Sequence, residues 1–361
     1  MKKEDLKNDW WVFPGFEIEK LISGLDLPTN ITFVPNPSSK PNDPLLYISE
    51  LYGQVKVITC DFKVQTYAKD LLNYEPDHKF PGSGESGLTG IVVEPESGDL
   101  FLSMIYLEDD KMKSKIIRTS SQDGLKMEKQ TVIMDGIPSV HAAHQIQALS
   151  IGFDSKLYVN IGDGMMDANV AQDDNDLRGK ILRMNLDGSI PTDNPNPKNH
   201  FFAKGFRNPF GAKWRKSDKS LYISDNGPSS DDRIARVCAG QNYGWPKSMR
   251  QNSLFWWNYT QAPTAIDFMQ DDQFPKEYFD ELFVALFGAA FAMGRAIKGK
   301  KIVKIKLNQD SSGVASYDEF VTYIGDGPSS LCGLTFGPKG LYFTDLHGGS
   351  LYLVKPILKK E

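Results

Sequence analysis

The sequence predicts an all-β protein, a six-bladed β-propeller with four antiparallel strands in each blade. A Leu-Tyr or Leu-Phe strand recurs six times, 54 to 64 residues apart, beginning at Leu46, Leu100, Leu157, Leu221, Leu282 and Leu341. Repeats of this length are typical of propeller blades with long loops. Tyr and Phe are also plentiful, Gly and Pro are spread evenly, and long helical periodicity is scarce. This composition favours many short strands joined by turns.

The remaining strands of each blade are placed around these markers. Apolar runs upstream, at residues 31–34, 90–93, 149–151, 211–214 and 334–336, predict innermost strands, and residues 265–268 are the best candidate in the blurred fifth repeat. Alternating runs downstream, for example residues 54–58, 301–305 and 350–354, predict third strands. Weaker runs at residues 66–68, 131–134 and 320–323 predict outermost strands.

The last repeat has no outermost strand after Val354, whereas the N-terminal run at residues 16–22 alternates as a strand does. We therefore expect this run to complete the last blade and close the ring, which leaves no open sheet edge. Trimming residues 1–23 should then lower stability sharply. The chain is read as a single domain over residues 1–361, with an N-terminal extension at residues 1–15 and an irregular loop insertion at residues 247–264.

Composition excludes several classes of function. A net charge of −5 and a pI near 5.7 leave no basic surface for nucleic acid, and no Lys/Arg run or long apolar run indicates a membrane. Cys60, Cys238 and Cys332 are far apart and are read as ordinary buried thiols. Acidic residues follow Met1-Lys2-Lys3 in place of an apolar signal segment, so we expect a cytoplasmic protein unless an export signal was removed.

The most informative stretch is residues 144–180. Two strand-like runs meet at a tight turn, with His144 at one end and the turn Gly162-Asp163-Gly164 at the other. Adjacent antiparallel strands bring such ends to one rim, where His144 is a candidate proton acceptor and Asp163 its partner. A structural histidine and an ordinary turn aspartate remain the alternative.

Two further loops carry polar groups suited to a ligand. Arg207 and Asn208 stand just before an innermost strand, where they can bind a carboxylate or a carbonyl group, or can tie two loops together. Residues 224–232 form an oxygen-rich loop of the kind that holds a hard cation, although a solvated acidic turn fits equally well.

Taken together, these stretches resemble the glucose/sorbosone dehydrogenase family. The resemblance is carried by His144, Asp163 and the runs at residues 179–183, 187–191, 205–211, 224–228 and 242–246. The family consists of soluble, calcium-containing propellers that use pyrroloquinoline quinone (PQQ). The resemblance implies that His144 accepts the proton of a sugar hydroxyl and that Asp163 supports it. It further implies that Arg207 and Asn208 contact the cofactor, that Glu85 lines the pocket, and that the carbonyls of Gly227 and Pro228 hold calcium.

This chain departs from the family where cations normally anchor the quinone carboxylates. The fifth blade reads Phe287-Gly288-Ala289-Ala290-Phe291-Ala292 and the last blade reads Ser330-Leu331-Cys332-Gly333. Unpaired buried carboxylates cost several kcal/mol each, so cations would have to come from elsewhere, with Arg295, Lys298 and Lys300 as candidates.

Three functions stay open. The first is a PQQ- and calcium-dependent dehydrogenase that oxidises a sugar or another alcohol. The second is a non-redox acid/base enzyme (lyase, isomerase or hydrolase) whose pocket, made more apolar by Phe287, Phe291 and Leu331, accepts a less polar substrate. The third is a binding propeller without catalysis. Each takes a small molecule, and the electron acceptor is not readable from the sequence.

Overall fold

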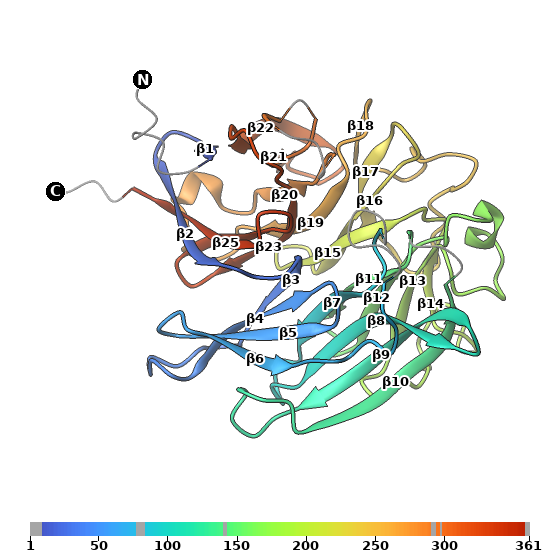
Figure 1. Cartoon of the computed structure of the whole chain (residues 1–361). Helices are drawn as coiled ribbons and strands as arrows, with labels where there is room; N and C mark the ends of the chain where they lie inside the picture. The colour runs from blue at the N-terminus through green and yellow to red at the C-terminus, as the bar shows by residue number, and fades with distance from the viewer. Residues whose placement is uncertain (1–8, 77–83, 140–142, 290–293, 297, 358–361) are drawn as a thin grey trace.

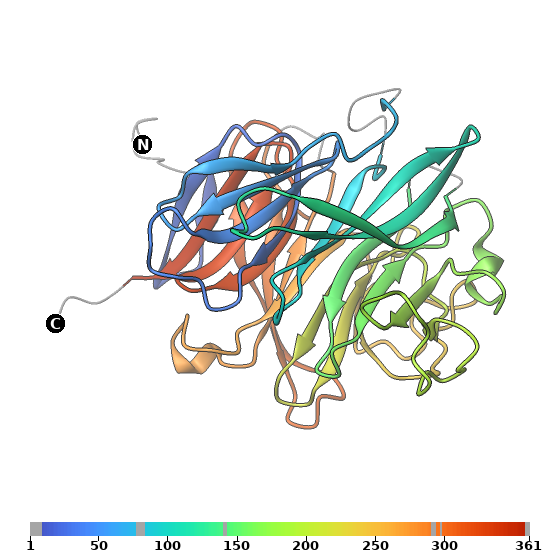
Figure 2. The ribbon, with the colours of Figure 1, turned by 90° about the horizontal axis from the view of Figure 1, so that it is seen from below.

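The computed structural model describes residues 9–76, 84–139, 143–289, 294–296 and 298–357. It is a ring of six antiparallel sheets, which confirms the predicted six-bladed propeller. The blades are arranged around one centre (Figure 1), and a second view, from below, shows their sheets side by side (Figure 2). Short 3-10 turns at Ala168–Ala171 and Lys276–Tyr278 are the helical elements of the described chain, and neither is long enough to span a membrane.

The strands run in chain order from the centre outward. Blade one holds β3 (Pro28–Phe33), β4 (Pro44–Glu50), β5 (Gln54–Thr59) and β6 (Val64–Ala68); blade two holds β7 (Leu88–Val93), β8 (Leu100–Glu108), β9 (Lys111–Ser120) and β10 (Lys129–Pro138). Blade three holds β11 (Ile146–Ile151), β12 (Leu157–Ile161), β13 (Lys180–Met184) and β14 (Phe201–Lys204); blade four holds β15 (Pro209–Arg215), β16 (Ser220–Asp225), β17 (Asp232–Val237) and β18 (Phe255–Trp257). All six marker strands are the second strand of their blade.

Blades five and six use both ends of the chain. Blade five holds β19 (Pro263–Phe268), β20 (Leu282–Leu286), β21 (Lys301–Leu307) and β22 (Val314–Tyr323), with β1 (Trp10–Val12) added outside β22 as a fifth strand. Blade six holds β23 (Leu331–Gly337), β24 (Gly340–Asp345) and β25 (Ser350–Pro356), and β2 (Phe16–Ser23) pairs antiparallel with β25. The expected closure of the ring by the N-terminal run is confirmed.

Three details differ from the sequence-based expectation. Blade five has five strands because β1 lies inside the stretch that we expected to be an extension. The stretch expected to be an irregular loop, residues 247–264, contains β18 and the first two residues of β19. Cys238 is exposed and Cys60 half-buried, so that of the three free thiols only Cys332 is buried as expected.

The hydrophobic core is divided into six clusters, each between two neighbouring blades. The cluster between blades five and six, for example, packs Phe283 and Phe320 of blade five against Leu334 and Phe343 of blade six. The other five clusters fill the remaining blade interfaces in the same way. Burying one face of a sheet against the next drives closure of the ring, because an unclosed array would expose two such faces.

At the centre, each innermost strand contacts the innermost strands on both sides. Every one of these six strands also shifts register with its neighbour close to its first residues. Such bulges leave residues unpaired and turn their side chains in a new direction. The residues within the shifts are Thr29, Thr89, Gln147, Ala148, Phe210, Gly211, Thr264, Cys332 and Gly333.

Candidate functional site

A cavity of about 340 Å³ lies at the centre of the ring, at the end where the innermost strands begin. Seven side chains from the six bulges line it: Thr29, Thr89, Gln147, Ala148, Phe210, Thr264 and Cys332. Loops add Glu85, His144, Arg207, Asn208 and Asn226, and an apolar part made of Leu51, Ala262, Phe287 and Leu346. The size suits a small organic molecule, and the few polar groups converge from different blades, as in ligand-binding pockets generally.

His144 and Asp163 form a buried pair, as the sequence predicted. The ring Nδ1 of His144 lies 2.6 Å from Oδ1 of Asp163, and both residues are more than nine-tenths buried. Burial acts to raise the pKa of Asp163, but hydrogen bonds from His144, the Met165 N–H and the Trp245 indole outweigh it and lower that pKa. Asp163 is therefore ionised and can only accept, so Nδ1 of His144 carries the shared hydrogen and Nε2 is the ring atom left to exchange a proton with a ligand.

The backbone around this pair is tightly fixed. His144 adopts a left-handed conformation with φ of 55°, which is uncommon for a residue other than glycine. Its carbonyl accepts the Gly164 N–H, and a Cβ on Gly162 would lie 2.4 to 2.8 Å from the main chain of His144. The glycine at residue 162 is thus required for the turn to approach the histidine.

Glu85 is the second carboxylate of the site and is partly buried. Oε2 accepts the main-chain N–H of His144 and the side-chain amide of Gln147, each at 2.9 Å, and Oε1 accepts from Asn208 at 3.1 Å. Burial raises the pKa of Glu85, although these donors and the charge of Arg207 oppose the shift. Glu85 therefore joins the His144 loop to the Asn208 loop across the cavity.

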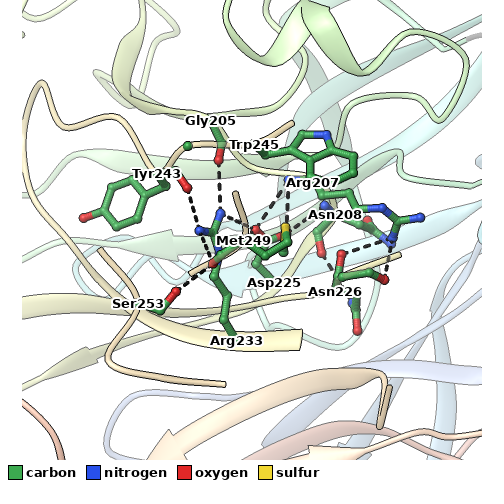
Figure 3. Close-up of polar contacts among 12 residues, drawn as sticks. Gly205, Arg207, Asn208, Asp225, Asn226, Arg233, Tyr243, Trp245, Met249 and Ser253 are labelled. Carbon is green, nitrogen blue, oxygen red and sulfur yellow. Dashed lines mark hydrogen bonds and ion pairs between the residues drawn. The ribbon is translucent and has the colours of Figure 1, made fainter. Parts of the chain in front are cut away.

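Arg207 and Asn208 approach the cavity from blade four. Asp225 accepts the main-chain N–H of Asn208 at 2.7 Å and that of Arg207 at 3.3 Å, which fixes the loop. Nη1 of Arg207 donates to the carbonyls of Asn226 (3.1 Å) and Gly227 (2.9 Å), and the guanidinium lies over the Trp245 ring (Figure 3). The main-chain carbonyl of Arg207 also accepts the Asp163 N–H, so the two parts of the site are linked directly.

Two amide oxygens in the cavity wall have no hydrogen-bond partner among the described residues. Oδ1 of Asn208 and Oδ1 of Asn226 are buried and accept no hydrogen bond, although both residues line the cavity. A buried acceptor without a donor is costly. Both oxygens are suited to a ligand hydrogen-bond donor or to a hard cation.

The residues expected at a calcium ion lie beside the cavity wall. Gly227 is buried and its carbonyl is in contact with Arg207. A Cβ at this position would lie 2.0 Å from the Ser230 carbonyl, so glycine is needed here. Pro228 is exposed, and neither residue is among those that line the cavity.

Of the apolar residues that stand where the family has cations, only some line the cavity. Phe287 and Cys332 line it, and burial together with Glu85 raises the pKa of the Cys332 thiol to about 12, so the thiol is neutral. Leu331 packs in the core between blades five and six and does not line the cavity, whereas Phe291 is outside the described residues.

None of the three proposed replacement cations lines the cavity. Arg295 and Lys298 are exposed, and Nζ of Lys300 donates to the Gly294 carbonyl. Arg207 is the one cationic side chain in the lining, as far as the structure describes it.

Three residues of the site received no role from the sequence. Trp245 holds Asp163, Asp225 holds the Arg207 loop, and Asn226 lines the cavity. The motifs that contain them were recognisable, but the contact between Trp245 and Asp163 spans 82 residues and depends on the packing of blade four against blade three.

A family model and the curated relatives of this chain indicate the same family. The model of a family described as Glucose / Sorbosone dehydrogenase matches residues 25–319. A quinoprotein glucose dehydrogenase B of Acinetobacter calcoaceticus is 29% identical over 267 residues, which cover 64% of this chain and 52% of that protein. An aldose sugar dehydrogenase of Escherichia coli is 25% identical over 306 residues, covering 76% of this chain and 78% of the relative. The chain thus spans about half the length of the first of these relatives.

Solved structures share the fold over nearly the whole chain. An oxidoreductase (glucose dehydrogenase) of Thermus thermophilus superposes with a TM-score of 0.77 at 23% identity and covers 94% of this chain and 100% of its own. The PQQ-bound form of an aldose sugar dehydrogenase from Streptomyces coelicolor has a TM-score of 0.71 at 19% identity and covers 96% of this chain and 100% of its own. At these identities the likeness concerns the fold.

Proposed function

Because the chain belongs to the glucose/sorbosone dehydrogenase family, we propose that it is a quinoprotein dehydrogenase that oxidises a sugar or another alcohol. The observation that carries the proposal is the buried His144–Asp163 pair at the wall of a central cavity. A carboxylate that orients a neutral imidazole leaves a base aimed at a bound hydroxyl group, which is the arrangement that alcohol oxidation needs.

The cavity wall offers oxygen atoms for a cation and one arginine for an anionic ligand. The unpartnered oxygens of Asn208 and Asn226 are of the kind that calcium prefers, and the carbonyls of Gly227 and Pro228 would join them if Arg207 released the Gly227 carbonyl. Arg207 would pair with one carboxylate of PQQ, and Asn208 would hydrogen-bond the cofactor. Burial raises the pKa of Glu85, which would make it easier for this carboxylate to take up a proton beside a bound anion.

The residues of this chain then have separate tasks. Nε2 of His144 takes the proton of the substrate hydroxyl, Asp163 stabilises the imidazolium that forms, and Trp245 keeps Asp163 in place. PQQ, if bound, would supply the acceptor for the hydride from the carbon that bears the oxidised hydroxyl group, and calcium would polarise that acceptor. The apolar part near Phe287 limits the entry of water and strengthens the electrostatic interactions within the cavity.

A dye-reduction assay tests this proposal. Purified protein loaded with calcium and PQQ is supplied with glucose, other aldoses and simple alcohols, and reduction of an artificial electron acceptor is followed. We expect substrate-dependent reduction that His144→Ala lowers by roughly 10²–10⁴-fold, with quinone affinity unchanged. Asp163→Asn should lower kcat and leave the affinity for quinone in place. Equal turnover by wild type and His144→Ala would refute the role of His144 as the base.

A second candidate function is favoured by the composition of the cavity wall. Arg207 is the single cation of the described lining, and the wall at Phe287, Leu346 and Cys332 is apolar or neutral. A ligand with several carboxylates pairs poorly with such a wall, so the same His144 base would instead serve a non-redox reaction on a less polar substrate. Turnover without quinone, abolished by His144→Ala, is the outcome that selects this function; ligand binding without any turnover selects a binding propeller.

A further inference from the structure

Arg233 is surrounded by oxygen atoms in a way that is unusual for an arginine. Its guanidinium donates to the carbonyls of Tyr243 (2.6 Å), Met249 (2.7 Å), Gly205 (3.0 Å) and Gln251 (3.3 Å). It also forms an ion pair with Asp225 at 2.7 Å. Figure 3 shows Gly205, Asp225, Tyr243 and Met249 around the guanidinium. The guanidinium thus has one carboxylate and four main-chain carbonyls as partners.

This group is sealed from solvent. The side chains of Arg233 and Asp225 are both 0% exposed, and the guanidinium lies near the rings of Phe206 and Tyr243. A buried charge persists only when it is paired and hydrogen-bonded. An oxygen cage of neutral carbonyls with one carboxylate is also what a hard metal ion such as calcium prefers, so here a side chain occupies a place with the chemistry of a structural cation site.

The cage is connected to both parts of the candidate site. Oδ2 of Asp225 takes the ion pair with Arg233, whereas Oδ1 accepts the main-chain N–H of Asn208 at 2.7 Å. The loop that provides the carbonyls of Tyr243, Met249 and Gln251 also carries Trp245, whose indole donates to Asp163 at 2.8 Å. The positive charge of Arg233 therefore holds the Asn208 loop through Asp225. It also holds the loop of Trp245, which contacts Asp163, the partner of His144.

We propose that Arg233 is a positioning residue that acts as a built-in structural cation, and that its oxygen cage accepts a free cation when the side chain is removed. Arg233 would hold the loops of Asn208 and Trp245 in this way whether or not a quinone is bound.

The test uses Arg233→Ala and two free cations, guanidinium and calcium, each added alone at millimolar concentration. We expect the variant to melt ~5–10 °C lower than the wild type, because one partner of a buried ion pair is lost. Either cation should restore a large part of that shift. Calorimetric titration should give one more calcium ion per chain for the variant than for the wild type, which separates the cage from any calcium site at the cavity.

A spectroscopic signal reports on positioning. The proton between Nδ1 of His144 and Asp163 is expected as a far-downfield resonance in the NMR spectrum, assigned by its loss in His144→Gln. It should weaken in Arg233→Ala and return with guanidinium. Arg118→Ala is the matched control, since Arg118 pairs with Asp99 at 2.6 Å and lies over Phe101 but has no carbonyl among its recorded partners; it should show neither rescue nor a change in this signal.

The proposal is overturned if neither cation stabilises Arg233→Ala more than it stabilises the wild type and the Arg118→Ala control. Should Arg233→Ala fail to fold, Arg233→Lys keeps the charge but cannot donate in all five directions. We then expect a folded protein with a lowered melting temperature and a weakened downfield resonance, and an Arg233→Lys variant with a wild-type spectrum and melting temperature would refute the positioning role.

Discussion

Two carboxylates of the site, Glu85 and Asp163, have pKa values that are shifted in opposite directions. Desolvation is the largest influence on both, but the pKa of Asp163 falls whereas the pKa of Glu85 rises. Asp163 accepts from the His144 ring, from the Trp245 indole and from a main-chain N–H. These donors favour the charged form enough to outweigh burial for Asp163, and those around Glu85 do not. The site therefore combines an orienting carboxylate with a lowered pKa and a second carboxylate with a raised pKa.

Glu85→Gln tests this difference through the pH dependence of stability. A carboxyl group whose folded pKa is raised contributes its full stability below the unfolded value of 4.5 and loses it as pH rises through the folded pKa. The free energy of unfolding of the wild type, relative to the variant, should therefore decrease between pH 4.5 and neutrality. Urea unfolding at several pH values measures this difference in free energy. A difference that grows with pH would contradict a raised pKa of Glu85.

At this scale the sequence predicted which residues meet but not how they are held. His144, Asp163, Glu85, Arg207 and Asn208 are brought together as expected. The expectation for Gly227 and Pro228 as calcium ligands stays a prediction, since the Gly227 carbonyl accepts a hydrogen bond from Arg207. The contacts that hold these residues, such as the one between Trp245 and Asp163, join loops that are far apart in sequence. No local pattern in the sequence predicts such contacts.

At the scale of the strands, a register shift near the start of every innermost strand creates the lining of the cavity. The repeat of apolar and Leu-Tyr runs predicted all six marker strands and the closing strand β2. It did not predict the shifts, because a strand with one unpaired residue has almost the same apolar pattern as a strand without one. It also missed β1 and β18, since each has only three residues, too few for a period to be seen.

Gly162→Ala tests the approach of the turn after β12 to His144. The added Cβ would lie within 2.8 Å of the main chain of His144, so one of the two segments must move. We expect a loss of about 1–3 kcal/mol in stability and a fall in turnover of roughly 10²-fold, because displacement of a catalytic group by about 1 Å has that effect.

The control for this variant is Gly313→Ala, where the new Cβ meets only the side-chain amide of Asn308 at 3.3 Å. It should be close to wild type in melting temperature and in turnover. Wild-type activity of Gly162→Ala would show that the close approach does not position His144.

Phe16→Ala tests the closing strand β2. Phe16 is 5% exposed and packs against the rings of Phe274, Tyr278 and Phe320. Its truncation should lower the free energy of unfolding by about 3–5 kcal/mol, as measured by denaturant titration. The neighbouring Glu17→Ala, at an exposed position of the same strand, should change it by less than about 1 kcal/mol. Equal effects of the two variants would mean that β2 adds little to the ring.

At the scale of the whole molecule, the ring gathers polar loops from several blades around one central cavity. The six clusters between blades pack neighbouring sheets together, and the loops at one end add the functional groups, as is common for sites built on stable scaffolds. Fold and family follow from the repeats and motifs. The identity of the ligand does not, because it depends on how many cations face the cavity, and Arg207 is the one that the described lining provides.

Titration of the calcium-loaded protein with PQQ, followed by absorbance and by the heat of binding, tests the central claim most directly. We predict saturable binding of one quinone per chain, which Arg207→Gln weakens by at least tenfold because it removes a charged hydrogen-bond donor and which His144→Ala leaves unchanged. No binding by the wild type at any quinone concentration up to the millimolar range would contradict the account and would assign His144, Asp163 and Arg207 to a different ligand.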